Sequence, residues 1–238
     1  MFEPASYRAP ASRPQGAALH EGLRTYMLGI YRTMALGLAV TGLVALLVSS
    51  TPALYGPIFG TPLKWVVMLA PLAFVFFFTF RIERMTVATA RATFFAFAAV
   101  MGVSMASIFL VFTDLSIATA FFAAAALFLG LSIWGYTTKT DLSRFSTFLM
   151  IGLFAVIAVS LVNLFIGSSL LQTAISVAGV LVFTGLTAWD TQRLKSEYLA
   201  YAGSQNTEKL AVMGALSLYL NLINLFQLLL QLIGQREE

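Results

Sequence analysis

The carboxylate best placed to do chemistry in this sequence is Asp190, which lies at the end of a long apolar run. Trp189 precedes it, and Arg193 follows three residues later. One interpretation is structural: an ion pair between neighbouring helical turns at a membrane boundary, beside an interfacial tryptophan. The functional alternative is a partly desolvated carboxylate at the mouth of a cavity, where binding of a proton would open or close a path. The spacing by itself favours the structural interpretation.

A second set of polar residues follows one face of the last apolar segment. Small and polar side chains recur there at spacings of three, four, three and seven residues, at Gly214, Ser217, Asn221, Asn224 and Gln231. Such spacings bring side chains onto one face of a helix. We expect this face to contact other helices, which places the last helix at the centre of a bundle. Interhelical hydrogen bonding explains such a face, and a polar cavity or ion path is the alternative.

The sequence lacks the residues that catalytic and metal-binding sites usually require. The chain has no cysteine and a single histidine, His20. It also has no phosphate-binding loop and no nucleophile motif. We therefore predict no catalytic residue, no enzyme activity and no cofactor. No metal centre is predicted either, although Asp190 remains a possible contact for a calcium ion.

These residues must be positioned by membrane-spanning helices. Of the 238 residues, 59% are hydrophobic and 10% are charged, whereas a soluble domain has roughly 45–50% and about 25%. Seven apolar runs have about the 20 residues needed to cross a hydrocarbon core. They cover approximately residues 26–50, 63–80, 88–112, 115–136, 145–166, 170–189 and 210–233. The predicted fold is an all-α polytopic membrane protein with seven transmembrane helices and the last helix central.

The charges predict the domain organisation and the orientation. Residues 1–24 are predicted to be a flexible tail, 25–234 the seven-helix domain, and 235–238 a short C-terminal tail. Twelve of the 14 Lys and Arg residues fall on the side of the N-terminus, and the other two are Lys64 and Arg236. The positive-inside rule then places the N-terminus in the cytoplasm. The C-terminus lies on the opposite side unless the short connection after the third span marks a re-entrant segment.

Three segments together resemble the transmembrane Bax-inhibitor-motif family, the Bax inhibitor-1-like proteins, in its bacterial branch. They are FTGLTAWDTQ at residues 183–192, ALSLYLNLINLF at 215–226 and GYTTKTDL at 135–142. The resemblance extends over about residues 26–234. It implies a seven-helix bundle around the last helix, a bacterial inner membrane location and a pH-sensitive calcium leak.

The resemblance also implies a gating site. The family pattern has two aspartates on the sixth and seventh helices that share a proton, and an arginine on the second helix. Asp190 matches the first aspartate, and Arg84 matches the arginine best, with Arg81 as the alternative. The second aspartate is replaced here by Asn221. Two close carboxylates repel each other, so this replacement leaves any pH response to Asp190 alone and weakens calcium binding.

The sequence therefore predicts a passive leak for calcium or other cations that is modulated by protons. Asp190 and Arg84 would be the gating groups, and the polar path would be lined by Asn221, Asn224 and Ser217. The expected partners are the lipid bilayer, calcium ions and protons. Nucleic acid is not expected, because the basic residues lie at membrane edges.

An interaction protein is the alternative class of function. Bacterial relatives of the family suggest a partner such as a membrane-bound ATP-dependent protease. The exposed tail, about residues 1–22, would be the handle for that partner. Its deletion should abolish an effect on the partner and leave ion flux unchanged.

Overall fold

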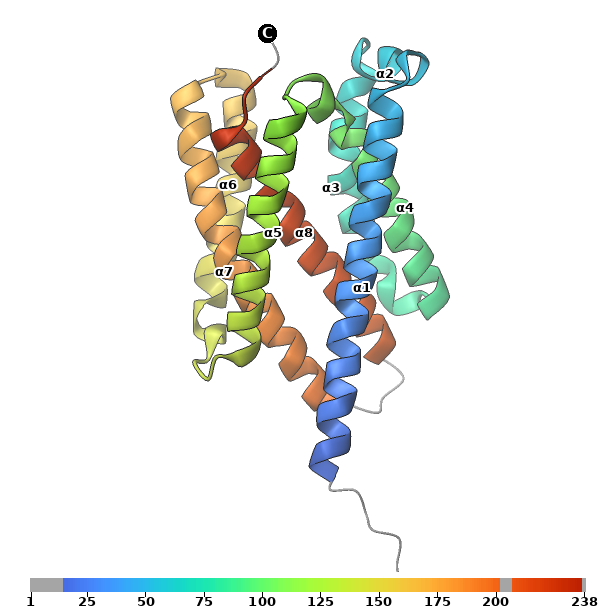
Figure 1. The fold of residues 1–238 in the computed structure, drawn as a ribbon, viewed down its shortest axis with the longest axis vertical. Helices are drawn as coiled ribbons and strands as arrows, with labels where there is room; N and C mark the ends of the chain where they lie inside the picture. Colours follow the sequence, from blue (N-terminus) through green and yellow to red (C-terminus); the bar gives the residue numbers. More distant parts are fainter. Residues whose placement is uncertain (1–14, 202–206, 237–238) are drawn as a thin grey trace, which may run out of the picture.

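The computed structural model describes residues 15–201 and 207–236, which form a bundle of helices (Figure 1). The α-helices are α1 Gln15–Ser49, α2 Pro52–Phe59, α3 Leu63–Arg81, α4 Val87–Met105, α5 Asp114–Thr137, α6 Ser146–Ile166, α7 Ser169–Tyr201 and α8 Thr207–Ile233. Three short 3₁₀ helices connect them: η1 Ile82–Arg84, η2 Ala106–Leu110 and η3 Leu142–Phe145.

Seven of these helices, all except α2, are long and apolar enough to cross a membrane. The predicted number of spans is therefore confirmed, and both helices around the short η2 connection are among them. The described chain begins and ends at opposite ends of the bundle (Figure 1). We call the end where α1 begins the N-side and the end where α8 finishes the C-side.

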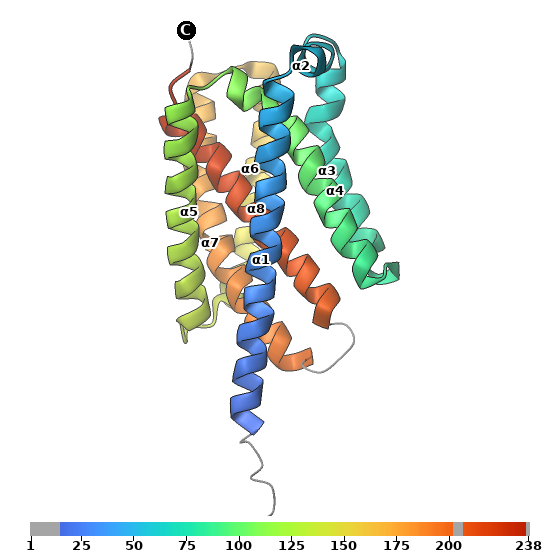
Figure 2. The same ribbon diagram turned by 45° about the vertical axis from the view of Figure 1, so that its right-hand side comes forward.

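Helix α8 occupies the centre of the bundle, as the polar stripe predicts. It runs obliquely between α1, α4, α5 and α7 and packs against all four (Figures 1 and 2). In the apolar stretch of α8 that could cross a membrane, 56% of the residues are buried within the protein. In the corresponding stretch of α6, only 11% are buried. A residue on α8 can therefore contact several other helices at once.

Two glycines bring the neighbours of the Asp190 region into close contact. A Cβ atom at Gly135 of α5 would lie 2.2 Å from the carbonyl oxygen of Ala188 on α7. A Cβ atom at Gly214 of α8 would lie 2.6 Å from the Leu194 side chain of α7. The Ala188 backbone cannot move aside for a side chain at Gly135, whereas a side chain at Gly214 would require Leu194 to shift, so glycine permits the close approach of α5 and α8 to α7.

Two helices extend further than the apolar runs indicate. Helix α7 continues to Tyr201, although the sixth apolar run was predicted to end at residue 189. The extension is stabilised by buried Leu194 and by the Arg193–Glu197 pair one turn apart. Helix α1 begins at Gln15, so residues 15–24 belong to a helix rather than to the predicted tail. Residues 1–14 of that tail lie outside the described residues.

Candidate functional site

The candidate site is the contact between α7 and α8 around Asp190, which we call the α7–α8 junction. The Asp190 residue is 3% exposed. One carboxylate oxygen, Oδ1, lies 2.8 Å from Nη2 of Arg193 on the same helix. The other, Oδ2, accepts hydrogen bonds from Ser217 Oγ at 2.9 Å and from Asn221 Nδ2 at 2.8 Å, both on α8. The carboxylate therefore joins the two helices.

Arg193 covers the junction on the N-side. Its guanidinium stacks over the Trp189 ring at 4.9 Å and donates to Ser217 Oγ at 3.4 Å. It also lies 3.6 Å from Glu197 Oε1. The Arg193 side chain is 36% exposed, whereas that of Asp190 is 5% exposed. The pair thus has a buried carboxyl group and a guanidinium that is partly exposed.

The structure brings together three of the predicted site residues: Asp190, Ser217 and Asn221. Asn224 is not among them, because its amide donates to the carbonyl of Leu220 on its own helix at 2.7 Å. Arg84 lies exposed in η1, and none of the ion pairs between described residues involves it. Arg193 is the arginine that pairs with Asp190.

A chain of hydroxyl groups fixes α7 beside the junction. Thr191, next to Asp190, bonds Ser132 of α5 at 2.9 Å. Ser132 in turn bonds the hydroxyl of Tyr31 on α1 at 2.5 Å. The register of α7 against α1 and α5 is therefore set by the residue immediately after Asp190. Sequence analysis did not identify Tyr31 or Ser132, because neither belongs to a polar stripe.

Gln192 of α7 forms hydrogen bonds with the backbone of the connection between α5 and α6. Its Oε1 accepts from the backbone N–H of Leu142 at 2.8 Å, and its Nε2 donates to the carbonyl of Thr140 at 2.8 Å. Within this connection, the backbone N–H of Ser143 donates to Asp141 at 2.9 Å and lowers the pKa of that exposed carboxyl. Two of the three motifs in the sequence, residues 135–142 and 183–192, are thus in direct contact.

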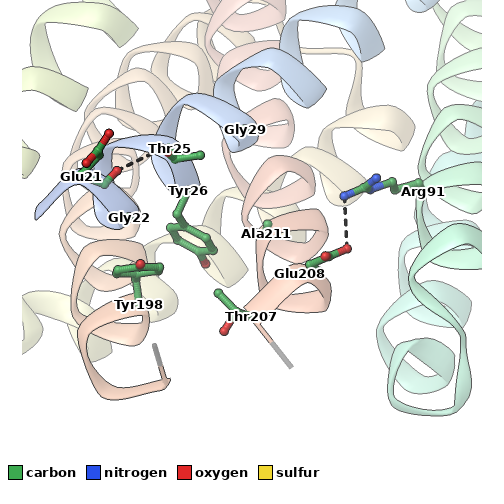
Figure 3. A pocket seen from close by; sticks show the side chains of 10 residues that line it. All are labelled: Glu21, Gly22, Thr25, Tyr26, Gly29, Arg91, Tyr198, Thr207, Glu208 and Ala211. Carbon is green, nitrogen blue, oxygen red and sulfur yellow. Dashed lines mark hydrogen bonds and ion pairs between the residues drawn. The ribbon is translucent and has the colours of Figure 1, made fainter. Parts of the chain in front are cut away.

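A hollow of about 640 Å³ lies at the N-side between α1, α4, α7 and α8 (Figure 3). Tyr26 and Tyr198 line it with their rings 5.0 Å apart, and an Arg91–Glu208 pair spans 3.4 Å at its edge. The Tyr26 hydroxyl is buried, with no hydrogen-bond partner in the part of the chain that the structure describes. Neither Asp190 nor its α8 partners line this hollow.

The junction in this state is an ion pair and not a preformed metal site. Among residues 15–201 and 207–236, no group of three or more His, Asp or Glu residues is placed to hold a metal ion. Asp190 faces a guanidinium and an amide nitrogen, both of which are donors. A calcium ion would have to displace Arg193 before it reached this carboxylate.

Comparison with known proteins identifies the family. The model of the family described as "Inhibitor of apoptosis-promoting Bax1" matches residues 23–238. The chain belongs to this family, the Bax inhibitor-1-like proteins. The match includes every residue of the α7–α8 junction and all seven spans except the start of α1.

Three similar proteins are bacterial and match along nearly their full length. An uncharacterized protein of Caulobacter vibrioides is 42% identical over 239 residues, which cover 96% of this chain and 95% of the relative. RP147 of Rickettsia prowazekii is 40% identical over 218 residues, 92% of each chain. The inner membrane protein YbhL of Escherichia coli is 38% identical over 218 residues, 90% of this chain and 93% of YbhL.

Proposed function

We propose that this Bax inhibitor-1-like protein is a proton-modulated passive leak for cations, with calcium as the leading candidate ion. The proposed gate is the α7–α8 junction. The observation that carries the proposal is the buried Asp190 carboxylate, which joins two helices through Arg193, Ser217 and Asn221. The role is transport and not catalysis.

Protonation of Asp190 would weaken three contacts at the same time. A neutral carboxyl no longer balances the guanidinium of Arg193, and it is a weaker acceptor for Ser217 and Asn221. Ser217 and Asn221 are the only junction partners that α8 contributes in the described residues. Loss of these bonds favours separation of α7 from α8, while Arg193 keeps Glu197 as a partner. The leak would therefore increase as the pH falls.

Asn221 limits the response to one titrating group. An aspartate in that position would repel Asp190, whereas the Asn221 amide donates a hydrogen bond to it. The amide thus stabilises the ionised, closed state. We expect a pH response of one proton and weaker calcium binding than a pair of carboxylates would give.

The proposed location is a bacterial inner membrane with the N-side in the cytoplasm. Inner membrane protein YbhL is similar over nearly the full chain. Apart from Lys64 and Arg236, the described basic residues at the ends of spans lie at the N-side, for example Arg81, Lys139 and Lys209, which favours a cytoplasmic N-side. The junction and the hollow in Figure 3 would then face the cytoplasm.

The decisive experiment measures calcium flux into proteoliposomes between pH 5 and pH 8. Wild type should show flux that rises at acidic pH, and Asp190→Asn should flatten the profile because the charge that holds the junction is gone at every pH. Asp141→Asn removes an exposed carboxyl on the same side and is the matched control. Flux that depends neither on pH nor on Asp190 would disprove the proposal.

A gating role for Arg84 stays a prediction, and the same assay tests it. Arg193→Gln should change flux because it removes the observed partner of Asp190. Arg84→Gln should change flux only if that exposed arginine acts in a second state of the protein. Absence of any flux above empty vesicles would favour the interaction protein, and deletion of residues 1–14 would then be compared with wild type for partner activity.

A further inference from the structure

A second hollow, of about 390 Å³, lies in the C-side half of the bundle. Its walls come from α1, α4 with η2, α5 and α8, and we call it the C-side hollow. The floor is made by Ile223 and Phe226 of central helix α8, and Leu38 and Ala45 line the α1 wall. From Leu38 to Ala45 the wall is about 10 Å long, or about one third of a hydrocarbon core.

The exposed residues that line the hollow, among them Phe121 and Phe122, place its mouth beside α5. Helices α1 and α5 are joined near the N-side by the Tyr31–Ser132 hydrogen bond, and each packs on α8 or its neighbours more than on the other. Phe121 and Phe122 line the α5 wall, and both are exposed on the outside of the bundle. The mouth therefore lies within the membrane-spanning part of the protein.

The residues that line the hollow are almost all apolar. Apart from Asp114 at one end, Thr41 is the only lining residue with a polar side chain. Its hydroxyl is already bonded to the carbonyl of Ala98 at 2.9 Å and to the Tyr219 hydroxyl at 2.6 Å. An occupant of this hollow must be apolar.

Asp114 lines the hollow, and the backbone brings Arg236 close to the start of the same helix. Asp114 is the first residue of α5. The backbone of Arg236 pairs with that of Phe112, two residues before Asp114. Gln235 is fixed nearby, because its N–H donates to Ser116 Oγ at 2.9 Å and its carbonyl accepts from Thr113 at 3.1 Å. Asp114 and Arg236 are thus held at the same end of the bundle, and both are exposed.

We propose that the C-side hollow binds one acyl chain of a zwitterionic phospholipid from the C-side leaflet. The ammonium of a phosphoethanolamine headgroup would face Asp114, and its phosphate would face Arg236. An acyl chain is the apolar molecule present at highest concentration at this mouth. It fills a void whose walls would otherwise lack van der Waals partners. The volume lies within the range of known ligand sites, about 300–1,000 Å³.

The free energy of binding would come from van der Waals packing and not from the hydrophobic effect, because bulk lipid is as apolar as the hollow. Selectivity for this site must therefore come from shape and from the charges of Asp114 and Arg236. Filling the hollow with a side chain should remove the bound lipid, and neutralising the charges should remove the headgroup preference.

Gly42 allows the hollow to be filled. It lines the hollow, and a Cβ atom built on it meets nothing within 4 Å. Gly130 on α5 has the same open surroundings but lies on the exposed surface away from the hollow, so Gly130→Phe is the matched control for Gly42→Phe. Gly42→Leu is a smaller filling variant for use if the phenylalanine variant does not fold.

The test is to purify each variant in detergent and to measure retained phospholipid per chain by mass spectrometry. Wild type and Gly130→Phe should retain about one phospholipid, and Gly42→Phe about tenfold less, which corresponds to about 1.4 kcal/mol. Equal retention by all three variants would overturn the proposal. Equal retention together with a change in oligomeric state for Gly42→Phe would instead assign the hollow to a second copy of the chain.

The headgroup is tested by adding back phosphatidylethanolamine or phosphatidylglycerol with identical acyl chains. Wild type should gain thermal stability from the ethanolamine lipid at several-fold lower concentration than from the glycerol lipid. Asp114→Asn and Arg236→Gln should each reduce this preference and leave the acyl-chain site occupied. A preference that is absent in wild type, or unchanged in both variants, would overturn the assignment of the headgroup.

Discussion

Helices α7 and α8 are fastened by polar side chains at both ends of their contact, but the two ends differ in charge. At the N-side, the carboxyl group of Asp190 lies 2.8 Å from the guanidinium of Arg193. At the C-side, the contact consists of neutral groups: Ser176 and Gln172 of α7 both bond Gln231 of α8, the first at 3.1 Å. Asn163 of α6 in turn bonds Gln172 at 3.1 Å. Between the two ends, Gly179 of α7 packs on Leu228 of α8.

The difference teaches which end can respond to protons. Amides and hydroxyls keep the same protonation state across the physiological range, so the C-side contact has a constant strength. The N-side contact depends on one carboxylate. In the proposed gate, protonation of Asp190 would loosen the N-side end of α8 and leave the C-side end attached, so α7 and α8 would separate at the N-side.

The largest expected effect comes from leaving the buried carboxylate without its arginine. Arg193→Met should destabilise the protein by about 3 kcal/mol at pH 8, the lower end of the range for breaking a buried pair because Arg193 is partly exposed. The loss should be smaller at pH 5, where a proton can neutralise the orphaned carboxylate. Reversible unfolding in SDS, followed by circular dichroism, measures both values.

Arg32→Met is the control, because Arg32 is exposed on α1 and belongs to none of the ion pairs between described residues. It should change stability by less than about 0.5 kcal/mol. Equal losses for the two variants would mean that the charge at the N-side junction has no special importance.

The next effect comes from giving the junction a second carboxylate. In Asn221→Asp, two like charges replace a hydrogen bond of 2.8 Å, so the variant should lose roughly 1–3 kcal/mol at pH 8 and regain it at pH 5. Calcium flux should become more steeply dependent on pH. The exchange variant Asp190→Asn/Asn221→Asp restores a single carboxylate and should recover the pH response that Asp190→Asn loses. Failure to recover it would show that the position of the charge, and not its presence, controls the gate.

A smaller effect is expected at the neutral end. Gln231→Leu removes hydrogen bonds to Gln172 and Ser176, so it should destabilise the protein by about 1 kcal/mol. The loss should be equal at pH 5 and pH 8. Gln227→Leu, one turn earlier on α8, is the control and should be nearly silent. If the Gln231→Leu loss depended on pH, the contrast between the two ends would be wrong.

Much of the architecture was predictable because the bilayer imposes it. A helix that crosses about 30 Å of hydrocarbon needs about 20 apolar residues, and such runs are visible without knowledge of packing. The stripe with Ser217 and Asn221 likewise predicted the central position of α8. The extension of α7 was not predictable in the same way. Beyond the membrane a helix has many polar residues, so its sequence resembles that of a loop.

The contacts of the site could be predicted only in part. Asn221 and Asn224 share one face of α8, but two crossing helices touch over a limited number of turns, and only Asn221 reaches Asp190. The Asp190–Arg193 pair was predicted from the spacing of three residues, whereas the match of Arg84 to the family pattern does not show which helix lies beside α7. In the structure, Arg193 is already on α7, one turn from Asp190, whereas Arg84 lies at the far end of α3.

The smallest effect is expected for Asp141→Asn. This variant tests whether the pH response belongs to Asp190 alone or also to another carboxyl on the N-side. The hydrogen bond from Ser143 lowers the pKa of Asp141, so this carboxyl is ionised in the folded protein throughout pH 5–8. A lowered pKa means that its stabilising contribution is present above the ordinary value and is lost only as the pH falls through the lowered one. Asp141→Asn should therefore leave both the flux profile and the stability profile between pH 5 and pH 8 unchanged. If this variant flattened the flux profile as Asp190→Asn should, protons would act through the α5–α6 connection that Gln192 holds, and the α7–α8 junction would follow that connection instead of sensing protons itself.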